Sequence, residues 1–380
     1  MGLTALDQTR LQEALALAEK SIGLSDPNPR VGCILGREDG SVFGCGFTQE
    51  AGGPHAEIMA LRDAAGQGAD LRGATAWVTL EPCAHHGRTP PCSDALVAAG
   101  IGHVVAAVED PHHAVAGRGL ARLRAAGVEV VLAGGDIADA ARELNIGFFS
   151  RALRGRPWVR LKAACSLDGR TALPNGESQW ITGPEARADG HAWRRRAGVV
   201  LTGIGTVLAD DPRLDVRLVP TARQPRRAVL DSTPRLTPAA RICGTPGTLV
   251  YTLRTDEAAA AALVDAGAEV VALPHAPGGG IALNALLADL AGREVNELHV
   301  EAGACLTGAW LKAELADELL LYMAATLLGE GPGIATLGRL TALDEGCQLQ
   351  LTDIRPVGAD LRLRLQSPGS LPAHWPARAG

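Results

Sequence analysis

Four residues near the N-terminus have the types and spacing needed for metal-assisted hydrolysis: His55, Glu57, Cys83 and Cys92. One imidazole and two thiolates provide three protein ligands for Zn²⁺ and leave its fourth tetrahedral position to a water molecule. Glu57 lies two positions after His55, so on a helix its side chain points in another direction and is free to transfer a proton. The set therefore predicts a zinc site that activates water for attack on a carbon atom.

The elements expected around these residues place them at the ends of helices and strands. A helix is expected to start at Pro54, a strand over residues 77–80 runs into the loop that carries Cys83, and another helix begins at Cys92. A helix N-terminus lowers the pKa of a cysteine and so favours the thiolate that zinc requires. Taken singly, His55 fits a helix cap and each cysteine fits a core position, but the complete arrangement favours a metal site.

A His-x-Glu triplet followed by two cysteines is the signature of zinc-dependent nucleobase deaminases, in which the glutamate moves protons and is not a ligand. That signature has two residues between its cysteines, whereas eight separate Cys83 from Cys92. One alternative is a cytidine or tRNA adenosine deaminase with an accessory domain. Another is a non-catalytic binding protein that is stapled by zinc, although a purely structural zinc does not need Glu57.

The segments around these residues closely resemble motifs of the bifunctional riboflavin-biosynthesis deaminase/reductase family. They are residues 26–32 (DPNPRVG), 53–57 (GPHAE) and 81–92 (EPCAHHGRTPPC). The resemblance implies a deaminase site with Glu57 as the catalytic proton donor and with three zinc ligands, His55, Cys83 and Cys92.

The same resemblance implies substrate contacts for Asn28, His85 and Asp110. Asn28 fits equally well as a turn residue between two prolines. The sequence departs from the family at one position, because the asparagine that usually follows Asp110-Pro111 is His112 here. A histidine can also donate a hydrogen bond, so this position remains a candidate contact.

The second half of the chain carries four further segments, residues 161–170, 177–183, 201–212 and 300–308. No G-x-G-x-x-G follows a strand there, so a Rossmann fingerprint is not supported, and Gly203-Ile204-Gly205 fits a tight turn as well. Glycines after the strand that ends at Glu301 instead free backbone N–H groups at a helix N-terminus, where a phosphate-bearing cofactor can bind. Arg194 and Arg217 fit either a clamp on a substrate phosphate or solvated surface positions.

These segments resemble the reductase half of the same family, whose fold is like that of dihydrofolate reductase. The resemblance implies a catalytic role for Lys162, in protonating the sugar oxygen or stabilising the opened sugar, whereas the residue alone also fits a surface lysine at a strand end. The implied substrate-binding residues are Ser178, Arg194, Leu214, Arg217 and Glu301. The implied NADPH-binding residues are Ala164, Trp180, Thr206, Asp210, Gly303, Ala304, Cys305, Leu306, Thr307, Gly308 and Ala309. No single residue distinguishes NADPH from NADH.

The order of apolar runs predicts an α/β protein with two domains. Strands and helices alternate with short connections in both halves, which indicates parallel or mixed sheets covered by helices. Near the C-terminus, residues 348–351 and 361–365 alternate strictly and predict an antiparallel hairpin. With the resemblance, we expect a cytidine-deaminase-like three-layer α/β/α domain over residues 1–150, a linker over 151–157, a dihydrofolate-reductase-like domain over 158–367 and a tail over 368–380.

Composition restricts the class of protein. The chain has 380 residues, 47% hydrophobic and 21% charged, with a formal net charge of −6, so no basic nucleic-acid face is expected. Its longest apolar run, residues 319–328, is far shorter than the roughly 20 residues that span a bilayer. No signal peptide is evident, so the eight cysteines are expected to be reduced in the cytoplasm.

The function predicted from these motifs is a two-step enzyme of riboflavin biosynthesis. The first domain would deaminate 2,5-diamino-6-(5-phosphoribosylamino)pyrimidin-4-one with Zn²⁺, and the second would reduce the ribosyl group to a ribityl chain with NADPH. The expected partner is this phosphorylated small molecule, with no nucleic acid and no membrane. The resemblance also implies a homo-oligomer.

Overall fold

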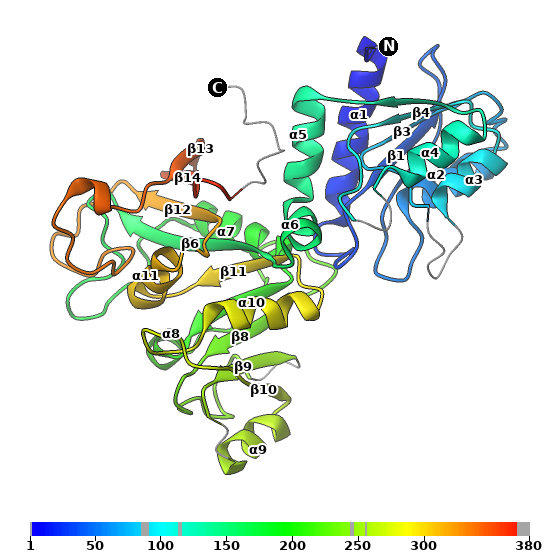
Figure 1. The fold of residues 1–380 in the computed structure, drawn as a ribbon. Coiled ribbons are helices and arrows are strands. Elements are labelled where there is room, and N and C mark those ends of the chain that lie inside the picture. The colour runs from blue at the N-terminus through cyan, green and yellow to red at the C-terminus, as the bar shows by residue number, and fades with distance from the viewer. Residues whose placement is uncertain (1, 85–90, 113–115, 244–246, 255–256, 371–380) are drawn as a thin grey trace. The chain divides into compact units, whose positions relative to one another are not determined.

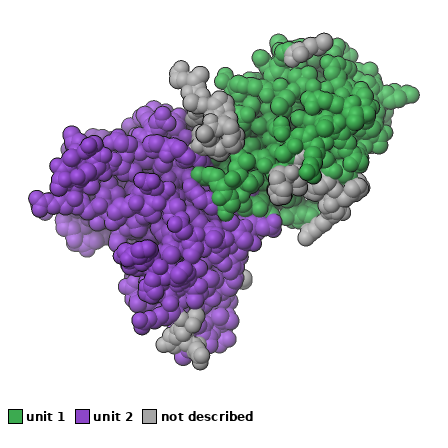
Figure 2. Space-filling model, in the orientation of Figure 1, with its two compact units in different colours: residues 1–155, 378–380 green, residues 156–377 purple. Residues whose placement is uncertain are grey.

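The structure is a computed structural model that describes residues 2–84, 91–112, 116–243, 247–254 and 257–370 (Figure 1). Its chain forms two compact units, Met1–Gly155 and Arg156–Ala377 (Figure 2). Among the described residues, no helix has the length and apolarity needed to cross a bilayer. Each unit is built on a sheet of its own, as the alternation of strands and helices predicts.

The first unit contains a five-stranded sheet in the order β2-β1-β3-β4-β5. The strands are β1 Gly32–Gly36, β2 Val42–Phe47, β3 Thr75–Val78, β4 His103–Ala106 and β5 Glu129–Leu132. β1 pairs antiparallel with β2 and β3, while β3, β4 and β5 run parallel. Every residue of β1 and β3 is buried, because helices cover both faces of the sheet.

Among the described residues of this unit, six α-helices pack around the sheet. They are α1 Ala5–Ala18, α2 Ala56–Gly66, α3 Cys92–Ala98, α4 Arg118–Ala125, α5 Gly135–Leu144 and α6 Ile146–Arg154, with a short 3₁₀ turn, η1 Glu19–Ser21. Figure 1 shows α1 beside α5, and α2, α3 and α4 gathered on the other face of the sheet. The result is the three-layer α/β/α arrangement expected from the sequence.

Two glycines of β2 determine how closely α2 approaches the sheet. A Cβ atom at Gly46 would lie 2.4 Å from the carbonyl oxygen of Ala56, and one at Gly44 would lie 2.4 Å from that of Ala60. Any side chain at either position would push the helix outward. The alternating glycines therefore set the depth at which the first turn of α2, with Glu57, enters the unit.

The second unit contains a nine-stranded sheet in the order β10-β9-β8-β7-β11-β6-β12-β14-β13. Its strands are β6 Trp158–Ser166, β7 Val199–Gly203, β8 Arg226–Leu230, β9 Thr248–Thr252, β10 Ala268–Ala272, β11 Glu297–Glu301, β12 Glu318–Ala324, β13 Gln350–Val357 and β14 Asp360–Gln366. The helices are α7 Pro184–Arg196, α8 Ile204–Asp210, α9 Glu257–Asp265, α10 Leu283–Gly292 and α11 Ala304–Lys312, with a 3₁₀ turn at η2 Leu343–Glu345. The strands from β10 to β12 run parallel, and β14 and β13 complete the sheet antiparallel.

The C-terminal hairpin expected from alternation is confirmed as β13 and β14. The sequence analysis did not recognise β12, which lies between β6 and β14 and contains most of the apolar run at residues 319–328. The reason is that a strand covered on both faces loses the period-two alternation that marks an exposed one.

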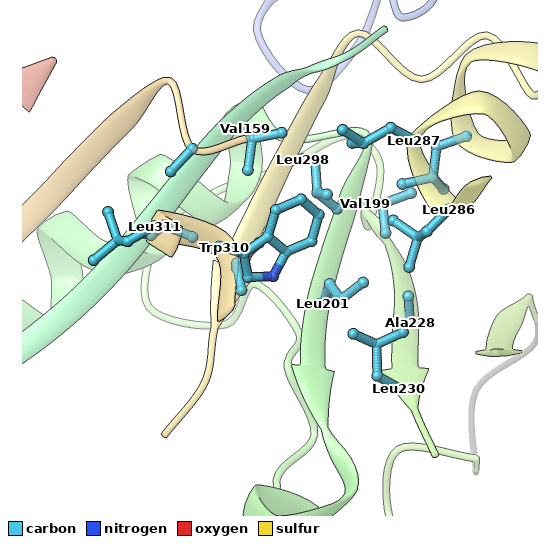
Figure 3. Close-up of a cluster of buried hydrophobic side chains, with 14 of the residues drawn as sticks. Val159, Val199, Leu201, Ala228, Leu230, Leu286, Leu287, Leu298, Trp310 and Leu311 are labelled. Carbon is cyan, nitrogen blue, oxygen red and sulfur yellow. The ribbon is translucent and has the colours of Figure 1, made fainter. Parts of the chain in front are cut away.

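The two faces of this sheet have different chemistry, because successive side chains of a strand point to opposite sides. On one face, Val159, Leu298 and Leu201 pack around the fully buried Trp310 of α11 (Figure 3). On the other face, β6 and β11 present charged groups beneath α7, among them Arg160 and Glu297. The apolar face thus holds α11, while the charged face holds α7.

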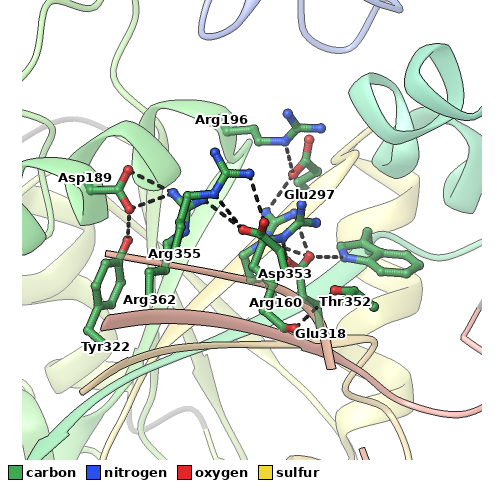
Figure 4. Close-up of polar contacts among 12 residues, drawn as sticks. Arg160, Asp189, Arg196, Glu297, Glu318, Tyr322, Thr352, Asp353, Arg355 and Arg362 are labelled. Atoms are coloured by element: carbon green, nitrogen blue, oxygen red, sulfur yellow. Dashed lines mark hydrogen bonds and ion pairs between the residues drawn. The ribbon is translucent and has the colours of Figure 1, made fainter. Parts of the chain in front are cut away.

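The charged face is built around Arg160, which is completely buried. Its Nη1 donates to Glu297 over 2.7 Å and its Nε donates to Glu318 over 2.9 Å (Figure 4). The Trp193 ring of α7 lies over this guanidinium, 4.4 Å from ring centroid to Cζ. Asp189, also on α7, accepts a 2.6 Å hydrogen bond from the Tyr322 hydroxyl of β12 (Figure 4). The contacts of Trp193 and Asp189 hold α7 against the sheet.

The expected linker over residues 151–157 was wrong in its first part. Residues 151–154 are the last turn of α6, whose buried face includes Ile146, Phe148 and Phe149. Arg151 and Arg154 belong to this helix because they hydrogen-bond within the unit, Arg151 to the carbonyl of Pro27 and Arg154 to Ser150. Only residues 155–157 connect the last helix of the first unit to β6.

Candidate active sites

The three predicted zinc ligands converge at the ends of two helices. His55 is the N-cap of α2 and Cys92 is the first residue of α3, while Cys83 lies in the segment that follows β3. Nδ1 of His55 lies 3.4 Å from Sγ of Cys92 and 3.7 Å from Sγ of Cys83, and all three ligand atoms lie within 4.8 Å of one another. Ligands on a tetrahedral zinc are separated by about 3.5–3.8 Å, so the donor set fits this ion.

The N-terminus of α3 stabilises a thiolate at this cluster. The backbone N–H of Cys92 donates to Sγ of Cys83 over 3.3 Å. The hydrogen bond from the Cys92 side chain, together with that from His55, lowers the pKa of Cys83 to about 4 against the opposing effect of burial. A thiolate is the form that binds zinc, so the protein prepares at least one sulfur ligand before any metal arrives.

Glu57 lies beside the cluster and is only 3% exposed. Burial, and then the neighbouring Cys83 thiolate, raise the pKa of this carboxyl to about 7. Its position on the first turn of α2 separates it from the His55 ligand atom, as the two-residue spacing predicts. The arrangement places a buried carboxyl next to the three donors, and this carboxyl is not one of the three clustered ligand groups.

Glu81 is a functional candidate that the sequence analysis quoted within a motif but gave no role. Its buried carboxylate accepts hydrogen bonds from the backbone N–H groups of Asp110 (3.2 Å), Gly117 (2.9 Å) and Gly119 (2.7 Å). A Cβ at Gly119 would lie 1.9 Å from the carbonyl oxygen of Pro82, so α4 starts directly against the segment before Cys83. Glu81 therefore joins this segment to the N-terminus of α4.

The predicted pyrimidine-side residues lie on two loops of the same unit. Asn28 is half-buried, and its loop is fixed by Asn145, whose Oδ1 accepts from the Arg30 N–H over 2.7 Å and whose Nδ2 donates to the Arg30 carbonyl over 2.9 Å. Asp110 is buried, which raises the pKa of its carboxyl to about 7, and its Oδ1 accepts from the His112 N–H over 2.8 Å. His85 lies outside the described residues.

A cleft in the second unit brings together most of the residues predicted for the reductase. It has a volume of 1930 Å³ and runs along the ends of β7, β8 and β11, where the chain enters α8 and α11. Single small-molecule pockets are commonly about 300–1000 Å³, so this cleft has room for two ligands side by side. All five predicted substrate residues line it: Ser178, Arg194, Leu214, Arg217 and Glu301.

Lys162 also lines the cleft and lies in a compact set of charges. Burial lowers the pKa of its ammonium group, against the opposing effect of Glu301. Glu301 forms a two-point ion pair with Arg194, through Nε and through Nη2 at 2.9 Å. Although desolvation of the half-buried Glu301 acts in the opposite direction, Arg194 holds the pKa of its carboxyl well below the usual range. Lys162 is therefore a half-buried cleft residue in the middle of β6, and not an exposed lysine at the end of a strand.

The predicted NADPH-binding residues divide into two sets. Those that line the cleft are Ala164, Trp180, Thr206, Asp210, Gly303, Ala304, Cys305, Leu306 and Ala309. Thr307 and Gly308 do not line it, which corrects that part of the prediction. Thr307 is buried and donates to the Ala302 carbonyl, and a Cβ at Gly308 would lie 2.2 Å from the Thr336 carbonyl oxygen. They lie on the face of α11 that packs against the protein.

Several cleft residues were missed by the sequence analysis, among them Arg187, His191, Arg213, Ser232 and Arg241. α7 was not predicted as a helix, so the i, i+3 relation between His191 and Arg194 was not seen. That spacing puts two side chains on one face of a helix and would have marked both as cleft residues. Arg187 lies on the same helix, whereas Arg213, Ser232 and Arg241 lie on loops, for which no periodicity exists to read.

Comparisons with known proteins match each unit to a protein family. Residues 4–108 match the cytidine and deoxycytidylate deaminase zinc-binding region, and residues 157–363 match the RibD C-terminal domain. The chain is 44% identical to the riboflavin biosynthesis protein RibD of Escherichia coli, over 94% of this chain and 99% of that protein. It is 39% identical to the RibD of Aquifex aeolicus, over 94% of this chain and 97% of that protein.

Solved structures give the same result for the fold. The RibD of Acinetobacter baumannii matches with a TM-score of 0.85 and 41% identity, covering 95% of this chain and 98% of that chain. A deaminase/reductase from Thermotoga maritima matches with a TM-score of 0.82 and 31% identity, covering 95% of this chain and 99% of that one. With a zinc-ligand cluster in one unit, a large cleft in the other and relatives matched over nearly their whole length, the chain belongs to the RibD family of bifunctional riboflavin-biosynthesis proteins.

Proposed function

We propose that the first unit hydrolyses the exocyclic amine of 2,5-diamino-6-(5-phosphoribosylamino)pyrimidin-4-one. The observation that carries this assignment is the cluster of His55, Cys83 and Cys92 with the buried Glu57 beside it. Zn²⁺ bound by these residues supplies Lewis-acid chemistry that activates a water molecule for attack on the ring carbon.

The residues of this unit then have separate tasks. Glu57 takes a proton from the attacking water and delivers it to the departing amine, so that ammonia leaves. Asn28 and Asp110, and His85 by the family resemblance, hold the pyrimidine or its ribose phosphate. Glu81, which lies two residues before Cys83, holds the Cys83 segment against the Asp110 loop. Its carboxylate accepts hydrogen bonds from the backbone N–H groups of Asp110 and Gly117.

We propose that the second unit reduces the ribosyl group of the deaminated product to a ribityl chain. NADPH, held by cleft residues at the starts of α8 and α11, would supply a hydride for the first carbon of the opened sugar. The carrying observation is a cleft large enough for two ligands, with the half-buried Lys162 and the Glu301–Arg194 pair at one wall. Lys162 donates a proton to the ring oxygen of the sugar as the ring opens.

The cofactor would lie along the loops that precede α8 and α11, where backbone N–H groups are unpaired within the helices. Gly303, Ala304 and Cys305 of the α11 N-terminus line the cleft there. Thr206 and Asp210 of α8 provide the opposite polar wall. This division leaves the Lys162 side of the cleft to the substrate.

Further parts of the proposal concern boundaries, partners and location. We place the deaminase in residues 1–150 and the reductase in residues 158–367, with the tail over 368–380 outside both activities. The enzyme is proposed to act on a small molecule in the cytoplasm as a homo-oligomer, without nucleic acid. The net charge of −6 supports the absence of a nucleic-acid partner.

Product analysis by mass spectrometry tests both assignments. The purified protein, with zinc content measured, is given the diaminopyrimidinone ribosylamino phosphate with and without NADPH. The deaminated compound is expected in both samples, and the ribityl compound only with NADPH. If only deamination is observed, the reductase assignment is wrong. If zinc-loaded protein catalyses neither reaction, both assignments are wrong.

A further inference from the structure

His191 is a cleft residue with no role in the mechanism described so far. It lies on α7, one helical turn before Arg194, and its residue surface is only 5% exposed. Its ring lines the cleft together with Arg194 and Arg217. A buried imidazole between two arginines is costly unless it is neutral, and this one has a defined hydrogen-bonding state.

The backbone of Arg217 determines which ring nitrogen carries the proton. The Arg217 N–H donates to Nδ1 of His191 over 3.1 Å, so Nδ1 is an acceptor and has no hydrogen. In a neutral imidazole the proton then resides on Nε2. Burial, followed by the charges of Arg194 and Arg217, lowers the pKa of His191 to about 4, which agrees with a neutral ring at physiological pH.

Nε2–H consequently faces a second donor rather than an acceptor. Its nearest polar neighbour is Nη1 of Arg194 at 3.4 Å, and Nη1 already donates to the Asp215 carbonyl over 3.0 Å. Two donors at this separation can both point at one oxygen atom placed between them. An anionic oxygen of a ligand in the cleft would satisfy both.

The local charges favour an anion at this point. The charged groups that act on the ring are Arg194, Arg217, Glu301 and Asp215. Glu301 is occupied by Arg194, and Asp215 accepts from Nη1 of Arg217 over 2.6 Å. The half-buried Lys162, which also lines the cleft, adds a positive charge beyond these two ion pairs. The described groups here therefore carry more positive than negative charge.

We propose that His191 is a specificity-determining residue that donates its Nε2–H to the phosphate group of the reductase substrate. This inference rests on the proposed function, which supplies a phosphorylated ribosylamino compound. The two arginines attract the phosphate by charge. A neutral N–H donor beside them adds a directional hydrogen bond, because its proton has one fixed position. The residue would thus separate phosphorylated from dephosphorylated substrate.

Two amide variants separate direct binding from a merely positional role. In His191→Gln the side-chain amide reaches the place of Nε2 and keeps a donor there, but loses the acceptor for the Arg217 N–H. In His191→Asn the amide oxygen takes the place of Nδ1 and keeps that acceptor, but places no donor at Nε2. Arg195→Ala is the matched control, since Arg195 lies on the same helix, does not line the cleft and donates to the Pro220 carbonyl.

The measurement is steady-state reduction of 5-amino-6-(5-phosphoribosylamino)uracil and of its dephosphorylated form with NADPH. We expect His191→Asn to raise KM for the phosphorylated compound about tenfold or more, the size of one lost hydrogen bond to a charged group. KM for the dephosphorylated compound and the Kd of NADPH should change less than twofold. His191→Gln should stay within about threefold of the parent enzyme, and Arg195→Ala should match it.

If His191→Gln raises KM for the phosphorylated compound and His191→Asn does not, the proposal is overturned. His191 would then only support the Arg217 loop. An equal loss for both compounds would also overturn it. Calorimetric titration with ribose 5-phosphate and with ribose separates this failure from failure of the proposed function. If the parent protein reduces neither compound, the proposed function fails. Loss of ribose 5-phosphate binding in the Asn variant alone still supports His191 as a phosphate ligand, and unchanged binding contradicts it.

Discussion

Glu301 of β11 is the direct parallel-register partner of Lys162 of β6, so the two side chains emerge side by side on the face of the sheet that lines the cleft. The positions are 139 apart in sequence but adjacent in the sheet. Glu301 is paired with Arg194, and this ion pair limits how far it can neutralise Lys162. The lysine therefore remains available to donate a proton to a ligand.

Replacement of Lys162 by methionine is expected to abolish reduction and leave deamination unchanged. Methionine fills a similar volume but has no proton, and general acid catalysis typically contributes about 10²–10⁴-fold. Separate assays of the two steps on one protein sample measure the effect. A reductase rate within a few-fold of the parent would remove Lys162 from the mechanism.

Glu57→Gln is expected to stop deamination while zinc content and Tm stay nearly the same. The amide keeps the size of the buried side chain, which is 3% exposed, but cannot transfer a proton. Rates, bound zinc by elemental analysis and thermal unfolding are measured on the same preparation, with the exposed Glu50→Gln as a control. Retained deaminase activity would exclude Glu57 as the proton shuttle.

Removal of zinc is expected to separate the two activities. The three-ligand cluster lies in the first unit, and no other His, Cys, Asp or Glu cluster of this kind occurs among the residues that the structure describes. Dialysis against a chelator should end deamination and preserve reduction of the deaminated compound, and added Zn²⁺ should restore the first step. Parallel loss of both activities would contradict separate sites.

Glu81→Ala should destabilise the first unit by about 2–4 kcal/mol and weaken zinc retention. The substitution leaves several backbone N–H groups unpaired in a buried setting, among them those of Gly117 and Gly119. Denaturant unfolding and competition with a chromophoric chelator measure the two effects. Glu81→Gln, which retains one acceptor oxygen, should lose less stability and less zinc. If chelator competition is unaltered in the Ala variant, Glu81 does not support the cysteine loop.

Glu318 makes the second unit sensitive to acid. Burial raises the pKa of this carboxyl, but Arg160 and Arg364 outweigh it and lower the pKa to about 2. Because the folded-state pKa lies below the unfolded value near 4.5, the stabilisation is complete above that value and is lost as the pH falls towards about 2.

Thermal unfolding of the second unit between pH 6 and pH 3 checks this behaviour. In Glu318→Gln the fall of Tm with decreasing pH should be smaller than in the parent protein. The variant should also be less stable by about 3–5 kcal/mol at neutral pH, because Arg160 is left buried without one of its partners. A parallel decline in the parent and variant would show that other carboxylates govern acid unfolding.

Local sequence was sufficient to predict the zinc cluster. His55, Cys83 and Cys92 lie at helix starts and after a strand, and each boundary is marked nearby by proline, glycine or an apolar run. The same signals predicted most strands of both sheets and the C-terminal hairpin. The sequence did not predict β12 or α7. β12 is almost uniformly apolar and lacks the alternation of an exposed strand, and α7 is rich in arginine and lacks the apolar stripe of a helix.

The sequence by itself therefore determined the two α/β units, the donor set for zinc and the order of the reductase motifs, since these depend on residue type and short-range spacing. Only the tertiary structure decided that Thr307 and Gly308 face away from the cleft, that Lys162 is half-buried beside Glu301, and that Nε2 of His191 lies next to Arg194. These relations depend on strand register and on how α7 packs over the sheet. Both are set by contacts between residues more than a hundred positions apart, which no local pattern encodes.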